Sequence, residues 1–316
     1  MKKLLFITDP IHNFKATDTT CLMFLTAKNL GYKVFYCLVN DIYSKNDQAW
    51  CNVKELNFSV TLTDNIADHP SWFCETEYSN NHLLNEFSAV LVRNDPPFDM
   101  EYYYLTQLLS IAEKHGAKVI NNSFALRNFN EKLTILQFPE LITPTIVTKN
   151  KHIILDFLNE HEVCVIKPLD LMAGRSVFRI SLTDVNHMVI IENITENFKQ
   201  TIMIQKFIPE VVKGDKRIFI IHGQVVPHCL YRIPAPSQIR GNLAVGGRGE
   251  VHELNNKDLE IANIIAKWAV KQGISFVGID VIGDKLTEIN ITSPTGARQI
   301  LASTGLNIIE LLFKQL

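Results

Sequence analysis

The sequence has no apolar run that approaches the ~18 residues of a membrane-spanning helix, which argues against a protein embedded in a bilayer. Its net charge is only -2, so it has no surplus of basic residues to bind DNA, RNA or an anionic membrane. It contains no G-x-G-x-x-G motif, and a dinucleotide site is therefore not supported. Internal repeats and low-complexity segments are also absent. We expect a globular protein without nucleic-acid or membrane partners.

Cysteine pairs of the C-x-x-C type are missing as well, although the chain has 6 cysteines. These cysteines lie far apart, and several stand in apolar runs such as FYCLV and VCVIK. The pattern favours reduced, buried cysteines in a cytoplasmic protein. We expect the N-terminal MKKLLFITDP to be a first strand rather than a signal peptide, because Asp9-Pro10 interrupts its apolar segment early.

The chain of 316 residues is 47% hydrophobic, which is enough for two domains or one divided domain with a large core. In its first third, short apolar runs alternate with helical patterns at 19–30 and 100–115, each of which is followed by a glycine. This alternation predicts a parallel sheet with helices on both faces. A connecting helix is then expected to contain residues 130–133. The later part mixes antiparallel strands with helices, so the predicted fold class is α/β followed by α+β.

Ligands of parallel sheets bind beyond the carboxyl ends of the strands, and two such ends carry polar residues. One is Asp9-Pro10, and the other begins at Arg93. Arg93 could pair with a substrate carboxylate. It could equally form a structural salt bridge with Asp95 or Asp99.

The stretch 276–295, FVGIDVIGDKLTEINITSPT, predicts a β-hairpin. A three-residue turn at 283–285 would pair Asp280 with Glu288 and would place the apolar residues of both strands on one face. A two-residue turn would send Asp280 to the opposite face from Glu288. We therefore expect the three-residue turn.

In that register the polar face of the hairpin carries Asp280, Glu288 and Asn290. Two carboxylates that face each other repel unless a cation lies between them, and hard oxygen donors suit Mg²⁺ that also binds phosphate. The alternative is a solvated polar face of a sheet. Gly278, opposite Asn290, leaves space for a ligand, and this favours the metal site.

Several short motifs, in order and nearly from end to end, resemble the bacterial glutathione synthetase family, whose members are ATP-grasp carboxylate–amine ligases. Each motif alone is short, but the set at its characteristic spacing is specific. The motifs are RNDPPFD (93–99), NEKL (130–133), IKPLD (166–170), GDKR (214–217), RGNLA (240–244), GGRG (246–249), VGID (277–280) and EINITSPT (288–295).

The resemblance implies a fold and an activity. ATP would phosphorylate γ-glutamylcysteine, and glycine would attack the acyl phosphate to give glutathione, ADP and phosphate, with Mg²⁺ or Mn²⁺ as the metal. It also implies a homotetramer. Two alternatives are a related peptide or γ-glutamate ligase with a different acceptor and a nucleotide-binding module with impaired turnover. The implied parts are an N-terminal Rossmann-like pre-ATP-grasp domain (1–123), a first ATP-grasp lobe (124–205), and a C-terminal lobe (206–316) with a lid loop (233–249) and the metal-binding hairpin.

The resemblance also assigns expected roles to individual residues. The nucleotide would contact Lys132, Lys167, Gln205, Lys206, Phe207, Ile208 and Asp215. Lys167, Arg217 and Arg240 would act in catalysis, while Arg93, Arg217, Arg232, Arg240, Ser293 and Thr295 would bind the substrates. The metal would be held by Asp280, Glu288 and Asn290. Without the resemblance, Lys132 would be interpreted as a solvated helical lysine. For Lys167 a solvated strand-end lysine is the alternative, but Pro168 and a loop follow at once and disfavour it. The alternative for the lid is an ordinary surface loop, whereas its glycines and arginines favour a loop that closes over anions.

The sequence departs from the family pattern in the loop at 170–176. The family has Asp-Gly-x-Gly-Gly there, whereas this chain has Leu171 and Ala173 in place of two glycines. Both side chains restrict the backbone, so its N–H groups are expected to approach phosphate less closely, and Arg175 could compensate. Asn94 and Gln299 also replace the lysine and glutamate that are common in the family.

Overall fold

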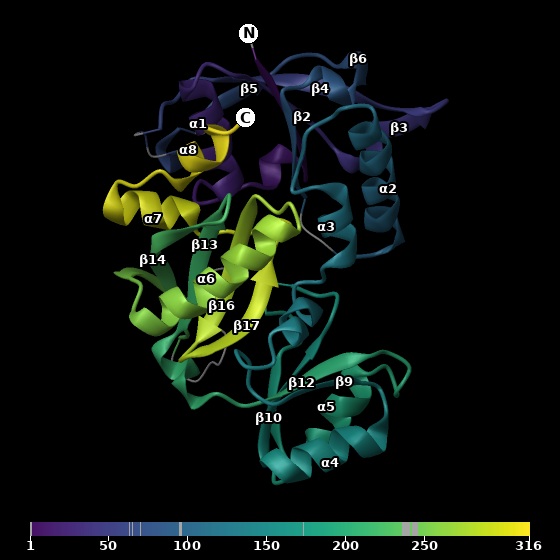
Figure 1. Cartoon of the computed structure of the whole chain (residues 1–316), viewed down its shortest axis with the longest axis vertical. Coiled ribbons are helices and arrows are strands. Elements are labelled where there is room, and N and C mark those ends of the chain that lie inside the picture. Colours follow the sequence, from purple (N-terminus) through teal and green to yellow (C-terminus); the bar gives the residue numbers. More distant parts are fainter. Residues whose placement is uncertain are drawn as a thin grey trace.

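The computed structural model describes residues 2–62, 64, 66–69, 71–94, 97–172, 174–235, 241 and 246–316. The strands of these residues form three sheets that follow one another along the chain. In Figure 1 the first sheet lies at the top, the third in the middle and the second at the bottom. Every helix within the described ranges is too short or too polar to cross a bilayer.

The first sheet has the strand order β3-β4-β2-β1-β7-β8, with β5 and β6 paired to β4. β1 runs parallel to β2 and β7. Leu4 and Phe6 share a core with α1, whereas Leu5 and Ile7 share one with α2, because alternate residues of a strand point to opposite faces. The predicted parallel sheet with helices on both faces is confirmed. The elements are β1 (Lys3–Thr8), α1 (Thr19–Asn29), β2 (Lys33–Cys37), β3 (Ile42–Lys45), β4 (Gln48–Phe58), β5 (Phe73–Glu75), β6 (Ser79–Leu83), β7 (Ala89–Arg93), α2 (Met100–Lys114), β8 (Val119–Ile120) and α3 (Ser123–Asn128), with short 3-10 helices η1 (Ile11–Asn13), η2 (Val39–Asp41), η3 (Ile66–Asp68) and η4 (Leu84–Glu86).

The second sheet is antiparallel, with the order β11-β10-β12-β9. Two helices, α4 and α5, cover one face and share a core with Cys164 and Ile166 of β10. The other face carries the alternating residues Val165 and Lys167. The elements are η5 (Leu133–Gln137), β9 (Thr145–Thr148), α4 (Lys151–His161), β10 (Val163–Pro168), β11 (Phe178–Ser181), α5 (His187–Ile194) and β12 (Ile202–Lys206).

The third sheet is also antiparallel, with the order β15-β14-β13-β16-β17. One face packs against α6 through aliphatic residues such as Ile218, Ile265 and Ile279. The opposite face points toward the second sheet and carries charged residues. The elements are η6 (Pro209–Lys213), β13 (Asp215–Ile221), β14 (Gln224–Ile233), β15 (Arg248–Glu253), α6 (Asn256–Lys271), β16 (Phe276–Ile282) and β17 (Lys285–Asn290).

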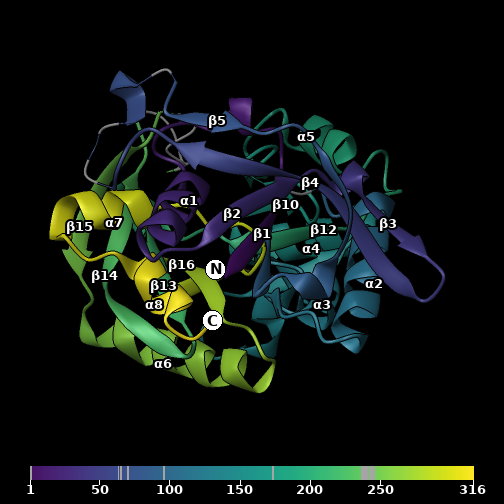
Figure 2. The same ribbon diagram turned by 90° about the horizontal axis from the view of Figure 1, so that it is seen from above.

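The chain ends by returning to the first sheet. Helices α7 (Ala297–Thr304) and α8 (Ile308–Phe313) follow the third sheet, yet Ile300, Ile308 and Leu312 belong to the core that contains α1. Figures 1 and 2 show α8 beside α1, with the two chain ends near each other. The last helices therefore fix the third sheet against the first.

The β16–β17 hairpin has a shorter turn than the sequence suggested. Ile282 pairs with Lys285, so the turn is the two residues 283–284, with a positive φ of 60° at the glycine. The expected three-residue turn is therefore wrong. A β-bulge between the Asp280 and Val281 pairings adds Thr287 to β17 and restores the predicted pairing of Asp280 with Glu288. The bulge, rather than the turn, therefore supplies the extra residue that places Asp280 opposite Glu288.

Asn121 joins the first sheet to both ends of that hairpin. Its Nδ2 donates to the carbonyl groups of Phe276 (2.8 Å) and Ile291 (2.6 Å). Its Oδ1 accepts from the backbone N–H groups of Ser275 (2.8 Å) and Phe276 (2.9 Å). The side chain is buried, so these backbone groups have little access to water once the amide is removed.

We expect Asn121→Ala to destabilise the protein by about 3 kcal/mol or more, because several buried backbone groups lose their partner. Urea unfolding measures this as a lower midpoint. Asn128→Ala is the matched control, since Asn128 is exposed and bonds only within its own helix among the described contacts. Equal midpoints for the two variants would show that the Asn121 bonds contribute little.

The cysteines differ sharply in exposure. All are free thiols, and Cys74 is exposed, whereas the other members of the set are buried: Cys21, Cys37, Cys51, Cys164 and Cys229. Burial raises the pKa of Cys21, Cys51 and Cys229 to about 12 and that of Cys164 to about 11. The expected buried, reduced cysteines are confirmed, with Cys74 as the exception.

We therefore expect a thiol reagent such as DTNB to modify one cysteine per native chain quickly, and all 6 after unfolding. Cys74→Ser should abolish the fast phase and leave the slow one. A second fast thiol in the native protein would contradict the burial described above.

Candidate active site

A cavity of about 460 Å³ lies where the charged face of the third sheet meets the second sheet, and a loop of the first sheet lines one part of it. The volume is in the range of small-molecule sites. Most of the predicted site residues line this cavity, although they come from distant parts of the sequence. They are Lys132, Lys167, Gln205, Lys206, Phe207, Ile208, Asp215, Arg217, Arg232, Asp280, Glu288, Asn290, Ser293 and Thr295.

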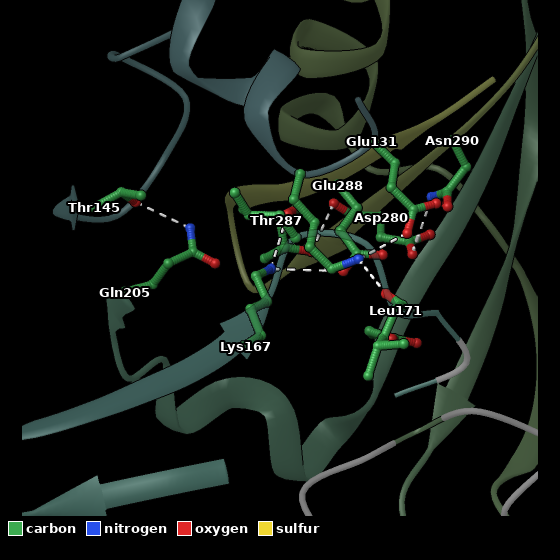
Figure 3. Close-up of polar contacts among 12 residues, drawn as sticks. Glu131, Thr145, Lys167, Leu171, Gln205, Asp280, Thr287, Glu288 and Asn290 are labelled. Carbon is green, nitrogen blue, oxygen red and sulfur yellow. Dashed lines mark hydrogen bonds and ion pairs between the residues drawn. The ribbon is translucent and has the colours of Figure 1, made fainter. Parts of the chain in front are cut away.

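The polar residues of the hairpin share one face, as predicted. Asp280 and Glu288 are cross-strand neighbours, and Asn290 Nδ2 lies 3.4 Å from Asp280 Oδ2. All three line the cavity (Figure 3). Gly278 lies opposite Asn290, and a Cβ at that position would come 2.7 Å from Pro294 Cβ and 2.9 Å from Arg217 Cδ. The glycine therefore leaves room for Pro294 and Arg217, and the expectation that it leaves space for a ligand is wrong.

Two arginines hold Asp280, which is only 4% exposed. Arg217 donates from Nε to Oδ1 (2.5 Å) and from Nη2 to Oδ2 (3.0 Å), while Arg232 Nη2 lies 2.9 Å from Oδ2. Burial opposes ionisation of Asp280, but the two guanidinium groups outweigh it and hold the pKa of the carboxyl well below its usual value. The carboxylate is therefore charged and fixed in place.

Arg232 is fixed from its other side by Asp215, its cross-strand partner. Arg232 donates to the Asp215 carboxylate from Nε (2.7 Å) and Nη2 (2.8 Å). Burial raises the pKa of Asp215, opposed by the charge of Arg232. The strand register thus pairs an acid with a base twice across this sheet. Arg232 of β14 lies opposite Asp215 of β13, and Arg217 of β13 lies opposite Asp280 of β16.

Lys167 reaches the hairpin from the second sheet. Its Nζ donates to the carbonyl of Thr287 (3.3 Å) and lies 3.6 Å from Glu288 Oε1 (Figure 3). Burial lowers the pKa of this lysine, while the charge of Glu288 opposes the change. The lysine is buried against the hairpin, so a strand-end lysine that points into solvent is excluded.

Lys132 is also buried, at 3% exposure, and is not a solvated helical lysine. The connecting helix predicted over 130–133 is wrong, because Lys132 lies in a turn just before η5. Its Nζ donates to Glu131 Oε1 (2.8 Å) and to the carbonyl of Leu171 (2.6 Å). Asn130 Oδ1 accepts from the N–H groups of residues 132 and 133, a capping pattern that leads the chain into η5.

Glu131 is a cavity residue that sequence reasoning missed. Burial raises its pKa, and the charges of Glu288 and Asp280 raise it further. Glu131, Asp280 and Glu288 all line the cavity (Figure 3), although among the described residues no three acidic, histidine or cysteine side chains lie close enough together to hold a metal ion by themselves. The available signal was the acid inside the NEKL motif, next to the lysine that the prediction selected.

The segment after β12 lines the cavity at the second sheet. Two of its backbone donors are already used within the protein: Lys206 N–H bonds Pro144 O and Phe207 N–H bonds Val163 O, both at 3.0 Å. The Lys206 side chain is exposed, while Gln205 is buried and donates to Thr145 Oγ1 (3.0 Å). The expected nucleotide contacts of this segment remain predictions.

Arg93 is not among the described residues that line the cavity. It is buried between the first and third sheets, where it donates to Thr20 Oγ1 (3.1 Å) and to Pro294 O (3.3 Å). Ser293 Oγ in turn lies 3.4 Å from Arg93 O. Direct contact with substrate therefore stays a prediction for Arg93, and its observed contacts hold the 293–295 segment in place.

Comparison with known proteins identifies the family. Residues 2–127 match a family model described as the N-terminal domain of prokaryotic glutathione synthetase, and residues 131–305 match the ATP-grasp domain of the same family. The chain belongs to the prokaryotic glutathione synthetase family. The resemblance seen in the sequence motifs is thereby confirmed.

Curated relatives in this family match along nearly the whole chain. The glutathione synthetase of Neisseria meningitidis serogroup B is 44% identical over 309 residues, which is 98% of this chain and 96% of that protein. The glutathione synthetase of Nitrosomonas europaea is 42% identical over 316 residues, 99% of this chain and 97% of that protein.

Solved structures support the fold at much lower identity. The ATP-grasp ligase PsnB, complexed with precursor peptide PsnA2 and AMPPNP, has a TM-score of 0.62 at 14% identity and covers 99% of this chain and 98% of its own. D-cycloserine synthetase DcsG has a TM-score of 0.62 at 13% identity, with 99% coverage of each chain. The predicted combination of a first α/β unit with an ATP-grasp unit is confirmed.

The loop that departs from the glutathione synthetase pattern is tied to Lys132 through the Leu171 carbonyl. Gly174 and Ser176 have φ values of 71° and 55°, so the second half of the loop still adopts left-handed backbone. Arg175 is exposed. Ala173 lies outside the described residues, and so does the expected lid residue Arg240. The ends of the predicted lid are strands, since Ile233 of β14 pairs with Arg248 of β15.

The charges of the glutathione synthetase cavity are arranged in acid–base pairs. Four of the acids that line the cavity have a base beside them, so these pairs add no net positive charge, while Lys15, Lys206 and Asp18 also line the cavity. Carboxylate and amide oxygens such as those of Asp280, Glu288 and Asn290 are the kind of donor that Mg²⁺ prefers. The pairs are Asp280 with Arg217, Asp215 with Arg232, Glu131 with Lys132, and Glu288 with Lys167.

Proposed function

We propose that this chain is an ATP-dependent ligase that joins γ-glutamylcysteine to glycine, with glutathione, ADP and phosphate as products. The observation that carries the proposal is full-length membership of the glutathione synthetase family together with a charged cavity built from the family motifs. A relative at 44% identity bears the name of this activity.

ATP and Mg²⁺, with Mn²⁺ as an alternative, are the proposed cofactors. A structural relative, PsnB, was solved with Mg and ADP, at a TM-score of 0.61. Asp280, Glu288 and Asn290 would hold the metal, and Glu131 stands beside them. When bound, the metal offsets negative charge on the phosphate oxygens.

The chain's own residues would act on the phosphates and on the reacting carboxylate. Lys132 and Lys167 would contact the phosphates of ATP, since both ammonium groups are buried in the cavity. Arg217 would direct its guanidinium at the oxygens that gain charge during phosphoryl transfer and glycine attack. Asp280 orients Arg217 for this role, and Arg232 in turn holds Asp280 in place. Thr295 O fixes Arg217 further by accepting from Nη1 (3.2 Å).

Further assignments follow the family. The adenine would lie at 205–208, in contact with backbone groups and apolar walls, and Asp215 would adjoin the nucleotide. Arg232, Ser293 and Thr295 would face the peptide substrates, and Arg240 would close over them within a lid. We propose domain boundaries at 123 and 205, a homotetramer, and a cytoplasmic location.

Phosphate release with ATP and Mg²⁺ tests the proposed function. We expect release only when γ-glutamylcysteine and glycine are both present, with glutathione formed in equal amount. Release that requires a different amine or acid would identify a related ligase with another acceptor or donor. ATP binding without release under any of these conditions would indicate a nucleotide-binding module without turnover.

A further inference from the structure

The loop that joins β1 to α1 lines the cavity; the sequence indicated its start, Asp9-Pro10, as a possible ligand-binding strand end but none of the loop residues that face the cavity. Asn13, Lys15, Thr17 and Asp18 all face the cavity from this loop. It follows the carboxyl end of a central parallel strand, where sheets of this kind bind ligands. In Figure 1, α1 lies above the third sheet and β12 lies below it, and residues of the loop before α1 and of the segment 205–208 line the same cavity.

Asp18 is the acid of this loop. It occupies the N-cap position of α1, but its side chain makes no capping hydrogen bond to that helix. Its Oδ2 accepts instead from the N–H of Lys15 at 2.7 Å. Burial raises the pKa of Asp18, against the lowering effects of Lys15 and Arg93. A partly desolvated carboxylate at a cavity wall gains stability from a cation placed against it.

We propose that Asp18 binds the α-ammonium group at the γ-glutamyl end of the donor. This inference rests on the proposed function, which places the donor's reacting carboxylate beside Arg217 and the nucleotide toward 205–208. The far end of the donor then extends to the remaining part of the cavity, where Asp18 lies. Lys15 lines the same part and supplies a positive charge for the adjacent α-carboxylate.

The same reasoning separates the donor from the acceptor. Glycine must present an unprotonated amine to attack the acyl phosphate, and a carboxylate that stabilises ammonium opposes that state. The donor's α-amino group takes no part in the reaction and stays protonated. Asp18 is therefore assigned as a specificity-determining residue for an α-amino acid head group.

The test compares two donors, γ-glutamylcysteine and glutarylcysteine, which differ only by the ammonium group. For the wild type we expect kcat/KM to be about 10- to 100-fold lower with glutarylcysteine, because a charge-assisted contact is lost. Asp18→Asn should lower kcat/KM for γ-glutamylcysteine by a similar factor and change that for glutarylcysteine by less than about 3-fold. Asp18→Glu should recover part of the preference, and the KM for ATP should not change.

Asp47→Asn is the matched control, because it removes an aspartate charge from an exposed turn of the first sheet. An equal loss of kcat/KM for both donors, or no loss for γ-glutamylcysteine, would overturn the assignment. If the wild type fails to turn over any donor, the proposed function fails instead. Calorimetric binding of the two donors then gives the same comparison of wild type and Asp18→Asn without turnover.

Discussion

Glu288→Gln is expected to lower turnover by about 100-fold or more while leaving the fold intact, because it removes a charge that the metal and Lys167 both face. The substitution preserves the size and shape of the side chain, which is 25% exposed. The concentration of Mg²⁺ that gives half-maximal activity should rise. Steady-state phosphate release at varied Mg²⁺ measures both effects, and thermal unfolding checks that the melting temperature is nearly unchanged.

Glu160→Gln is the control for the loss of a carboxylate. Glu160 lies on α4 of the second sheet with a side chain that is 72% exposed, and we expect wild-type activity from this variant. If Glu288→Gln kept wild-type turnover and wild-type Mg²⁺ dependence, the hairpin would not be the metal site.

Arg217→Lys is the second substitution for which we expect a large effect, a fall in turnover of about 100- to 1,000-fold. Arg217 contacts both oxygens of Asp280 and the carbonyl of Thr295 at once. An ammonium group cannot reproduce this planar fork, so the charge would remain but its direction would be lost. The loss should appear in kcat more than in the KM for ATP.

Arg127→Lys is the matched substitution outside the cavity. Arg127 of α3 bonds Thr106 O (3.2 Å) and Ser110 Oγ (3.0 Å) of α2. It should leave turnover within about 2-fold of the wild type, since no cavity residue depends on these bonds among the described contacts. Equal losses in the two arginine variants would show that Arg217 acts only through stability.

The hairpin illustrates how far sequence patterns reach. Alternation assigned Val277, Ile279 and Ile289 to the core and Asp280 and Glu288 to the other face, and the structure agrees. Alternation has a period of two residues and survives changes in the turn. Alternation cannot reveal a β-bulge. The sequence therefore predicted one extra residue in the turn, whereas in the structure the extra residue of the hairpin is Thr287 in β17.

The residues that were missed share a different cause. Glu131 and Asp18 lie about a hundred residues or more from the hairpin in sequence, and neither interrupts a hydrophobic pattern. Their proximity to the cavity arises from how the first sheet and the turn before η5 are placed against the third sheet. For Arg93 the sequence left a substrate contact and a structural salt bridge equally open, and its printed contacts are with Thr20 and Pro294 between the first and third sheets.

The sequence by itself determined the alternation of strands and helices in the first sheet, the core face of the β16–β17 hairpin, the pairing of Asp280 with Glu288, and the family. Those features depend on local periodicity and on motifs, which are read along the chain. Only the tertiary structure decided which acids are paired with which bases, that Lys132 is buried, and that the β1–α1 loop closes the cavity. These depend on how three separate sheets pack together, and packing brings side chains into contact regardless of their distance in sequence.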